Sequence, residues 1–528
     1  MKRSTRTWVT LVALIGTLLL LGGASLAENG RDGTLNYGFT GQIPEPGFDP
    51  AVVVSDAATI ILRNTYGRLV EYSEDATELH PGLAKNWEVS NDGLTYTFHL
   101  REGVKFHDGT PLKAEDVYYS FNRVMEIGEG YSWLLTQNIA EDGITVQGEH
   151  QLKIRLKKPF PAFLNVMADQ HVANVVNSAV VKEHASDEDP WAKDYLYDHA
   201  PGTGPFKLTE WKHNQYIALE RNEGYWEGKP KLEKIIFQII PEPETASLML
   251  RKGELDMVQK LPTEITNFVA AKEGIKISSA PALQYTQFLF NHRIPPLDNK
   301  KVRQAICYAI NYESLMKNIV GREQGVRMKG MLLQGMLGYD SQRFGYSHRP
   351  EKARELLQEA GHPDGFEISI EYPVWGNIPR MAVLIQANLA EVGIRAKLKE
   401  MAFGPFLEAV KNGDIPIFPW EGSPAYNEPS GFLYPKLHSK NIGKGSGGNV
   451  AAYSNPKVDK LLEEVMEELD EERRAELYGE IDEIVTRDAY GIFLYQNVLR
   501  RSLRTWVKGY TTPVLQGPDF SEVYIEKK

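Results

Sequence analysis

The chain has 528 residues, of which 42% are hydrophobic and 24% are charged, and its formal net charge is −11. This composition is typical of a large soluble globular protein with several domains, and it excludes disordered and collagen-like chains. The acidic balance argues against a nucleic-acid binder, because such proteins carry a basic face. A single cysteine, Cys307, excludes an intramolecular disulfide and cysteine-rich zinc or iron–sulfur sites.

The N-terminus has the pattern of a cleaved export signal. Basic residues precede the apolar run 8–21, and the small residues Ser25 and Ala27 follow it. This order predicts cleavage between Ala27 and Glu28, and therefore a periplasmic protein. The apolar run is shorter than the ~20 residues that span a bilayer. Ser25 stands where a lipoprotein would need a cysteine, so we expect no lipid anchor.

The mature chain has the pattern of a mixed α/β protein. Alternating apolar and polar residues predict strands at 94–100, 151–156 and 366–372. Apolar residues at helical spacing predict helices at 301–310, 351–360 and 379–392, and two charged helices within 456–487. The order helix, strand, helix, strand between 351 and 400 predicts helices stacked on a sheet.

Motifs for catalysis or metal binding are missing from the sequence. The glycine-rich segment 443–449 lacks the spacing of a phosphate-binding P-loop, and there is no Gly-x-Ser-x-Gly or His-Glu-x-x-His motif. We therefore predict no catalytic residue, no metal site and no cofactor, and a protein that is not an enzyme.

Two tryptophans are candidates for ligand contact. Trp375 and Trp420 each end a strand-like run and enter a loop rich in Gly, Pro and Asn. Loops at strand ends are where α/β domains hold ligands, and flat amphipathic rings suit a binding cleft. Packing in the core is an equally good explanation for either ring at this point.

Several motifs resemble those of peptide-family solute-binding proteins, the extracytoplasmic receptors of ABC importers for peptides, nickel and some sugars. They appear in family order along nearly the whole mature chain. They are PGLAKNWEVSNDGLTYTFHLR at 81–101, GVKFHDGTP at 103–111, GTGPF at 202–206, PLDNKKVRQA at 296–305, PEKARELL at 350–357 and YSNPKVD at 453–459. Agreement over so many segments is highly specific.

This resemblance implies an α/β, two-lobed periplasmic-binding-protein fold of the cluster C type. The implied first lobe is discontinuous, 28–283 plus 496–528, with an additional subdomain near 72–198. The second lobe is 284–495. Closure of the lobes would bury the ligand, which stabilises the closed state through its preference for that state.

The resemblance also places the ligand pocket at Trp375, Trp420, Glu421, Ser423 and Tyr426. Dipeptide-binding members have an aspartate, which holds the peptide ammonium, where this chain has Ser423. They also carry an arginine for the carboxylate in the loop that reads Pro373–Asn377 here, whereas Arg380 comes later. A buried charge without a partner costs several kcal/mol, so these differences argue against a free dipeptide with two charged ends.

Three functions remain open at this stage. The first, and the default, is a receptor for an oligopeptide or a modified peptide. The second is a receptor for an oligosaccharide or other uncharged polar solute, and the third is a secreted hydrolase on the same fold. A nickel ligand stays possible, although no histidine cluster supports it. For a receptor, the implied partners are two permease subunits and, through them, an ATPase pair; the protein itself would be a monomer.

Overall fold

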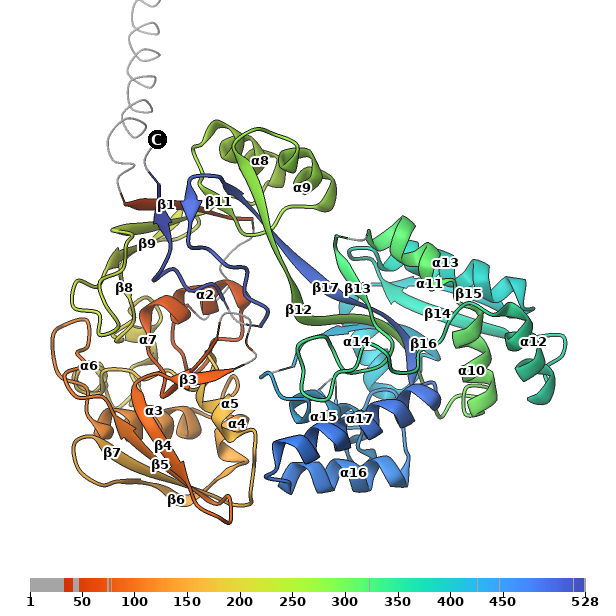
Figure 1. Ribbon diagram of the computed structural model, residues 1–528, viewed down its shortest axis with the longest axis horizontal. Coiled ribbons are helices and arrows are strands. Elements are labelled where there is room, and N and C mark those ends of the chain that lie inside the picture. Colours follow the sequence, from red (N-terminus) through yellow and green to blue (C-terminus); the bar gives the residue numbers. More distant parts are fainter. Residues whose placement is uncertain are drawn as a thin grey trace, which may run out of the picture.

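The computed structural model describes residues 33–40, 47–73, 76, 78–321, 323–424, 426–445, 447–515 and 517–526. The polypeptide forms two lobes joined by two long strands (Figure 1). The predicted signal sequence, residues 1–27, lies outside the described residues. Within the described part of the chain, no helix is both long enough and apolar enough to cross a membrane.

One mixed sheet of eleven strands runs through both lobes. Its order is β15-β14-β16-β12-β17-β11-β1-β10-β9-β8, with β13 paired to β17. The first-lobe strands are β1 (Thr34–Phe39), β8 (Phe206–Lys212), β9 (Tyr216–Arg221), β10 (Lys234–Ile239) and β11 (Met257–Val258). The second-lobe strands are β13 (Gly325–Arg327), β14 (Glu367–Pro373), β15 (Arg395–Met401) and β16 (Ile417–Gly422).

The two connecting strands are β12 (Ile275–Phe290) and β17 (Gly491–Arg504), which pair with each other antiparallel. At ~3.3 Å per residue, the 16 residues of β12 span ~50 Å, enough to run through both lobes. Their pairing is irregular between Pro281 and Tyr285. A ladder interrupted at this point bends more easily than a regular one, and the interruption lies where the chain passes from lobe to lobe.

A separate antiparallel sheet builds the subdomain of the first lobe, in the order β4-β5-β7-β6. Its strands are β4 (Ala84–Val89), β5 (Thr95–Leu100), β6 (Ile139–Val146) and β7 (Gln151–Leu156). The short strands β2 (Val70–Tyr72) and β3 (Leu79–Pro81) pair beside it. The first-lobe helices are α2 (Asp56–Thr65), α3 (Ala114–Ile127), α4 (Trp133–Thr136), α5 (Phe163–Met167), α6 (Ser178–His184), α7 (Lys193–Leu196), α8 (Pro243–Lys252) and α9 (Thr263–Ala270).

Helices cover the second-lobe strands. They are α10 (Lys300–Ala309), α11 (Tyr312–Leu315), η1 (Met316–Val320), α12 (Pro350–Glu359), α13 (Ile378–Glu391), α14 (Phe403–Asn412), α15 (Ser430–Leu437), η2 (Ser439–Asn441), α16 (Pro456–Glu467) and α17 (Glu471–Arg487). The chain ends with the pair β18 (Val507–Lys508) and β19 (Tyr524–Ile525) beside β1 in the first lobe.

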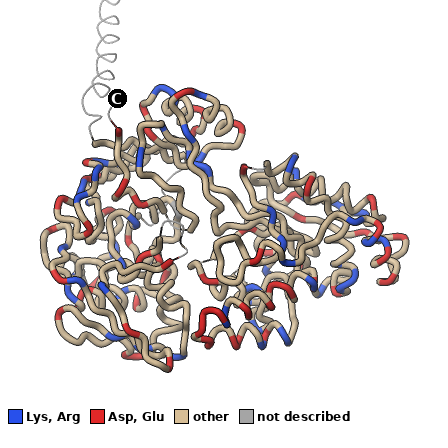
Figure 2. The backbone as a smooth tube through the Cα atoms, in the orientation of Figure 1, with Lys and Arg blue, Asp and Glu red and all other residues tan. Residues whose placement is uncertain are grey.

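The predicted elements and the predicted fold class are confirmed, with boundaries that move by only one or two residues. In α13, Met381, Ile385 and Leu389 are fully buried, as the helical spacing of these apolar residues predicted. Acidic and basic residues alternate along the backbone of both lobes (Figure 2), in keeping with a mixed charge distribution in a chain of net charge −11.

Candidate functional site

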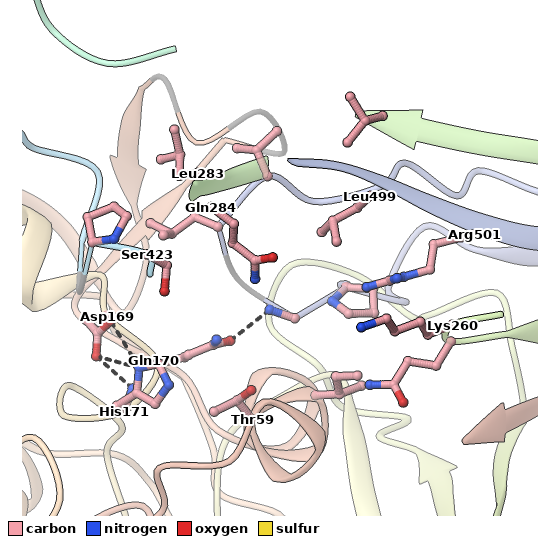
Figure 3. A pocket seen from close by; sticks show the side chains of 18 of the residues that line it. Thr59, Asp169, Gln170, His171, Lys260, Leu283, Gln284, Ser423, Leu499 and Arg501 are labelled. Carbon is pink, nitrogen blue, oxygen red and sulfur yellow. Dashed lines mark hydrogen bonds and ion pairs between the residues drawn. The ribbon is translucent and has the colours of Figure 1, made fainter. Parts of the chain in front are cut away.

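A cavity of about 590 Å³ lies where the two lobes and the connecting strands meet. Its volume falls in the usual range for small-ligand sites, ~300–1,000 Å³. The first lobe contributes Thr59, Asp169, Gln170, His171 and Lys260. The connecting strands contribute Leu283, Gln284, Leu499, Arg500 and Arg501, and the second lobe contributes Ser423, Phe432, Pro435 and Lys436. Figure 3 shows Leu283, Gln284, Leu499, Arg501 and Ser423 at the cavity.

One end of the cavity carries a carboxylate. Asp169, just after α5, is only 3% exposed and accepts hydrogen bonds from the backbone N–H of His171 (2.8 Å) and from its ring Nδ1 (3.2 Å). The His171 ring packs against Tyr131 with centroids 4.4 Å apart. Beside them, Gln170 accepts a hydrogen bond from the backbone N–H of Gly517. These contacts fix the carboxylate in place at the cavity wall.

Cations lie at the other end, away from Asp169 in Figure 3. Lys260 follows β11, and Arg501 belongs to β17. Among the described residues, neither Lys260 nor Arg501 has a carboxylate within ion-pair distance, and the buried Nε of Arg501 has no hydrogen-bond partner. The phenols of Tyr37 and Tyr510 lie near Arg501, and burial raises the pKa of both. They are therefore neutral and leave the guanidinium charge uncompensated.

The second-lobe wall adds another cation. Lys436 Nζ donates to the carbonyl of Gly447 (3.1 Å) and stands 5.4 Å from the centre of the Trp420 ring. Burial lowers the pKa of Lys436 to about 8. Arg500 also borders the cavity, but it pairs with Glu323 at 2.9 Å.

Of the five residues predicted from sequence, Ser423 is among the cavity-lining residues and is exposed there. Trp375 and Glu421 are brought together: Trp375 Nε1 donates to Glu421 (3.1 Å), which also accepts from Thr286 Oγ1 (3.0 Å). Trp420 is not among the cavity-lining residues, and its ring packs against the Lys436 ammonium. Tyr426 is buried in the core of the first-lobe subdomain, edge-on to Phe160.

Glu428, the next acidic residue after Glu421 along the chain, is buried away from the cavity. Its carboxylate accepts from Ser430 and from Tyr478, and burial raises its pKa. It does not belong to the cavity lining.

Sequence reasoning missed Asp169, Lys260 and Arg501. The polar triplet Asp169-Gln170-His171 lies between two mostly apolar segments, 162–168 and 172–176, and was the available signal for a wall of this kind. Nothing local marks Lys260 or Arg501, because their role depends on which strands lie side by side.

The loop after β16 joins the second lobe to the first-lobe subdomain. The backbone N–H of Asn427 donates to Tyr72 Oη (3.2 Å), and its carbonyl accepts from Asn165 Nδ2 (3.3 Å). Its side-chain amide donates to the carbonyl of Ala76. A second contact lies at Gly93, where an added Cβ would come within 2.8 Å of Leu469. These contacts join the second lobe to the first-lobe subdomain.

The Tyr426→Ala substitution should favour separation of the lobes, because it removes the second lobe's buried ring from the subdomain core. A loss of ~1.4 kcal/mol of preference for the closed form lowers ligand affinity about tenfold. Small-angle X-ray scattering of the ligand-free protein should show a larger radius of gyration. Tyr118→Ala, at an exposed position on α3, is the control. Unchanged scattering for Tyr426→Ala would show that this contact does not hold the lobes.

Two lobes, two connecting strands and a cavity between them define the class of extracytoplasmic solute-binding proteins. Residues 78–444 match the family model described as "Bacterial extracellular solute-binding proteins, family 5 Middle". The chain belongs to this family, which confirms the resemblance seen in the sequence.

Similar proteins match nearly the whole chain. The "Probable D,D-dipeptide-binding periplasmic protein DdpA" of Escherichia coli (strain K12) is 31% identical over 476 residues, 89% of this chain and 90% of the relative. The "Dipeptide-binding protein" of the same strain is 31% identical over 509 residues, 91% and 92% of the two chains. These relatives are binding proteins rather than enzymes.

Solved structures agree with the fold. HbpA2 from Haemophilus parasuis has a TM-score of 0.85 at 26% identity and covers 94% of this chain and 100% of its own. DppA from Helicobacter pylori, in complex with the peptide STSA, has a TM-score of 0.77 at 28% identity and covers 94% and 98%.

Proposed function

We propose that this protein is the periplasmic receptor of an ABC importer and that it captures a peptide between its lobes. Its relatives include a dipeptide-binding protein and a structure solved with a bound peptide. Export through the signal sequence, with cleavage after Ala27, places the protein where such a receptor works.

The observation that carries this proposal is the charge arrangement of the cavity. Asp169 lies at one end, and Lys260 and Arg501 lie at the other (Figure 3). A peptide with free termini has an ammonium and a carboxylate separated by its backbone. Asp169 binds the ammonium, and the cations bind the carboxylate through charge-assisted hydrogen bonds.

These first-lobe and β17 groups take over roles that dipeptide-binding relatives give to the second lobe. Ser423 contributes a hydroxyl to the ligand in place of a charge. Trp420 positions Lys436, and Trp375 holds Glu421 beside the strand pair. Tyr426 acts through contact between the lobes rather than by touching the peptide.

The lobe boundaries are part of the proposal. The first lobe is 28–283 plus 496–528, with its subdomain at about 72–198, and the second is 284–495. The proposed boundaries fall inside β12 and β17, next to the irregular pairing and to Leu283 and Gln284 of the cavity wall. Bending there opens the monomeric receptor, and the closed form docks on two permease subunits.

A thermal-shift screen tests the ligand class. Di- to hexapeptides, oligosaccharides and nickel salts are compared at about a millimolar with the mature protein. A micromolar ligand stabilises the folded state by ~4 kcal/mol under these conditions. We expect only peptides to raise the melting temperature. A response to oligosaccharides or nickel alone would contradict the proposal.

A further inference from the structure

The cavity contains more basic groups than acidic ones. Lys260, Arg501 and Lys436 border it, whereas Asp169 is the one acidic residue among the described lining residues. Arg500 also borders the cavity, but its charge is paired with Glu323. The whole chain carries a formal charge of −11, so the cavity has the opposite sign to the protein around it.

The protein provides hydrogen-bond partners for the carboxylate at one end of the cavity, but it provides no carboxylate for the cations at the other end among the described residues. Asp169 is already held by the backbone and ring of His171. The Arg501 guanidinium has neutral phenols nearby, and its buried Nε lacks a hydrogen-bond partner. Lys260 follows the short strand β11 and is exposed toward the same space (Figure 3).

A partly desolvated cation without a counter-ion loses hydration, and a neutral partner such as the Tyr510 hydroxyl beside Arg501 replaces that hydration only in part. A ligand carboxylate that enters this end restores it, and low-dielectric walls strengthen the attraction. The peptide C-terminus supplies one such carboxylate. Lys260 and Arg501 are two cations at this end, so the C-terminal carboxylate leaves room for a second negative charge.

We infer that the preferred ligands are acidic peptides, with a second carboxylate that binds at the Lys260–Arg501 end. This inference rests on the proposed function and narrows it to a substrate class. Lys260 and Arg501 are then specificity-determining residues, while Asp169 serves all peptides alike.

Calorimetric titrations of matched peptides test the inference. The peptides have the length that binds in the thermal-shift screen, and Glu, Gln or Lys is placed at each side-chain position in turn. At the best position, we expect the Glu peptide to bind at least tenfold more tightly than its Gln isostere, and the Lys peptide to bind most weakly. Raising the salt concentration should reduce the Glu preference.

The variants Arg501→Gln and Lys260→Gln should each weaken binding of both peptides, because both carry the C-terminal carboxylate. They should weaken the Glu peptide more, so that the Glu-to-Gln preference falls to about threefold or less. Because Arg501 is partly buried, the exposed Lys260 provides the test if Arg501→Gln does not fold. Lys411→Gln, on the exposed side of α14, is the matched control and should keep the full preference.

Equal binding of the Glu and Gln peptides would overturn this inference and leave the peptide receptor intact. Tighter binding of the Lys peptide would overturn it as well. If no peptide of any length binds, the proposed function itself fails, and this inference fails with it.

Discussion

Replacement of Arg123 by methionine is expected to lower the free energy of unfolding by about 3–5 kcal/mol. Arg123 on α3 and Asp49 form a bidentate pair with two N–O distances of 2.7 Å, and both side chains are 1% exposed. Arg123 Nε also donates to the carbonyl of Trp191 (2.9 Å). The pair ties the N-terminal segment around Asp49 to α3. Without the guanidinium, the buried Asp49 carboxylate has no counter-ion. The midpoint of urea denaturation measures the loss.

Two further variants separate the charge effect from lost packing. The double variant Asp49→Asn with Arg123→Met removes both charges, so it should recover part of the stability lost in Arg123→Met. Lys193→Met breaks an exposed pair with Glu129 and should change stability little, because solvent screens such pairs. If Arg123→Met costs no more than Lys193→Met, the pair does not contribute as we expect.

Acidification from pH 7 to 4.5 is expected to destabilise the protein through two histidines. Desolvation lowers the pKa of His292 to about 3 and that of His107 to about 4. In the unfolded chain each titrates near 6.5, so the unfolded state takes up protons first as the pH falls. Stability is therefore lost below about pH 6.5, by roughly 2–3 kcal/mol for each histidine at pH 4.5.

A carboxyl group acts in the opposite sense over part of this range. Burial raises the pKa of Asp482 to about 6, so the folded state binds this proton more tightly and gains stability as the pH falls from about 6 toward 4. The net loss is smaller than the two histidines alone would give. Comparing a single histidine variant with the wild type therefore tests the histidine contribution more sharply than the pH dependence of the wild type alone.

His292→Gln should flatten the pH dependence by roughly 2–3 kcal/mol between pH 7 and 4.5. His292 Nε2 lies 3.1 Å from the carbonyl of Tyr490, and a glutamine can donate to the same oxygen. Unfolding free energies from urea titrations at several pH values measure the effect. His80→Gln, at an exposed histidine, should keep the wild-type curve. Parallel curves for His292→Gln and wild type would rule out this role.

The sequence predicted much of the fold correctly because helices and strands follow from the spacing of apolar residues that are close together in the chain. The stripe of Met381, Ile385 and Leu389 predicted α13, and alternating residues predicted the strand at 151–156. His107 lies in the family motif at 103–111, and its ring nitrogens face the carbonyls of Ala200 and Gly204. The family motifs are local as well, so the family could be recognised from the sequence alone.

The binding site was less predictable. Trp375 and Trp420 were candidates because each follows a strand, yet one holds Glu421 and the other lies behind Lys436. Local position shows that a side chain lies near a strand end, but not which way it faces or what covers it. Tyr426 shows the same limit, since its ring is buried in the core of the opposite lobe.

The sequence by itself determined the class of fold, the secondary structure and the family, since each depends on residues close together in the chain. Only the tertiary structure brought Asp169, Lys260 and Arg501 to one cavity. They come from a subdomain loop, the end of β11 and β17, which are distant in sequence. The physical reason is that burial and ion pairing depend on distances in the folded protein. The number of residues between two positions in the sequence does not give those distances.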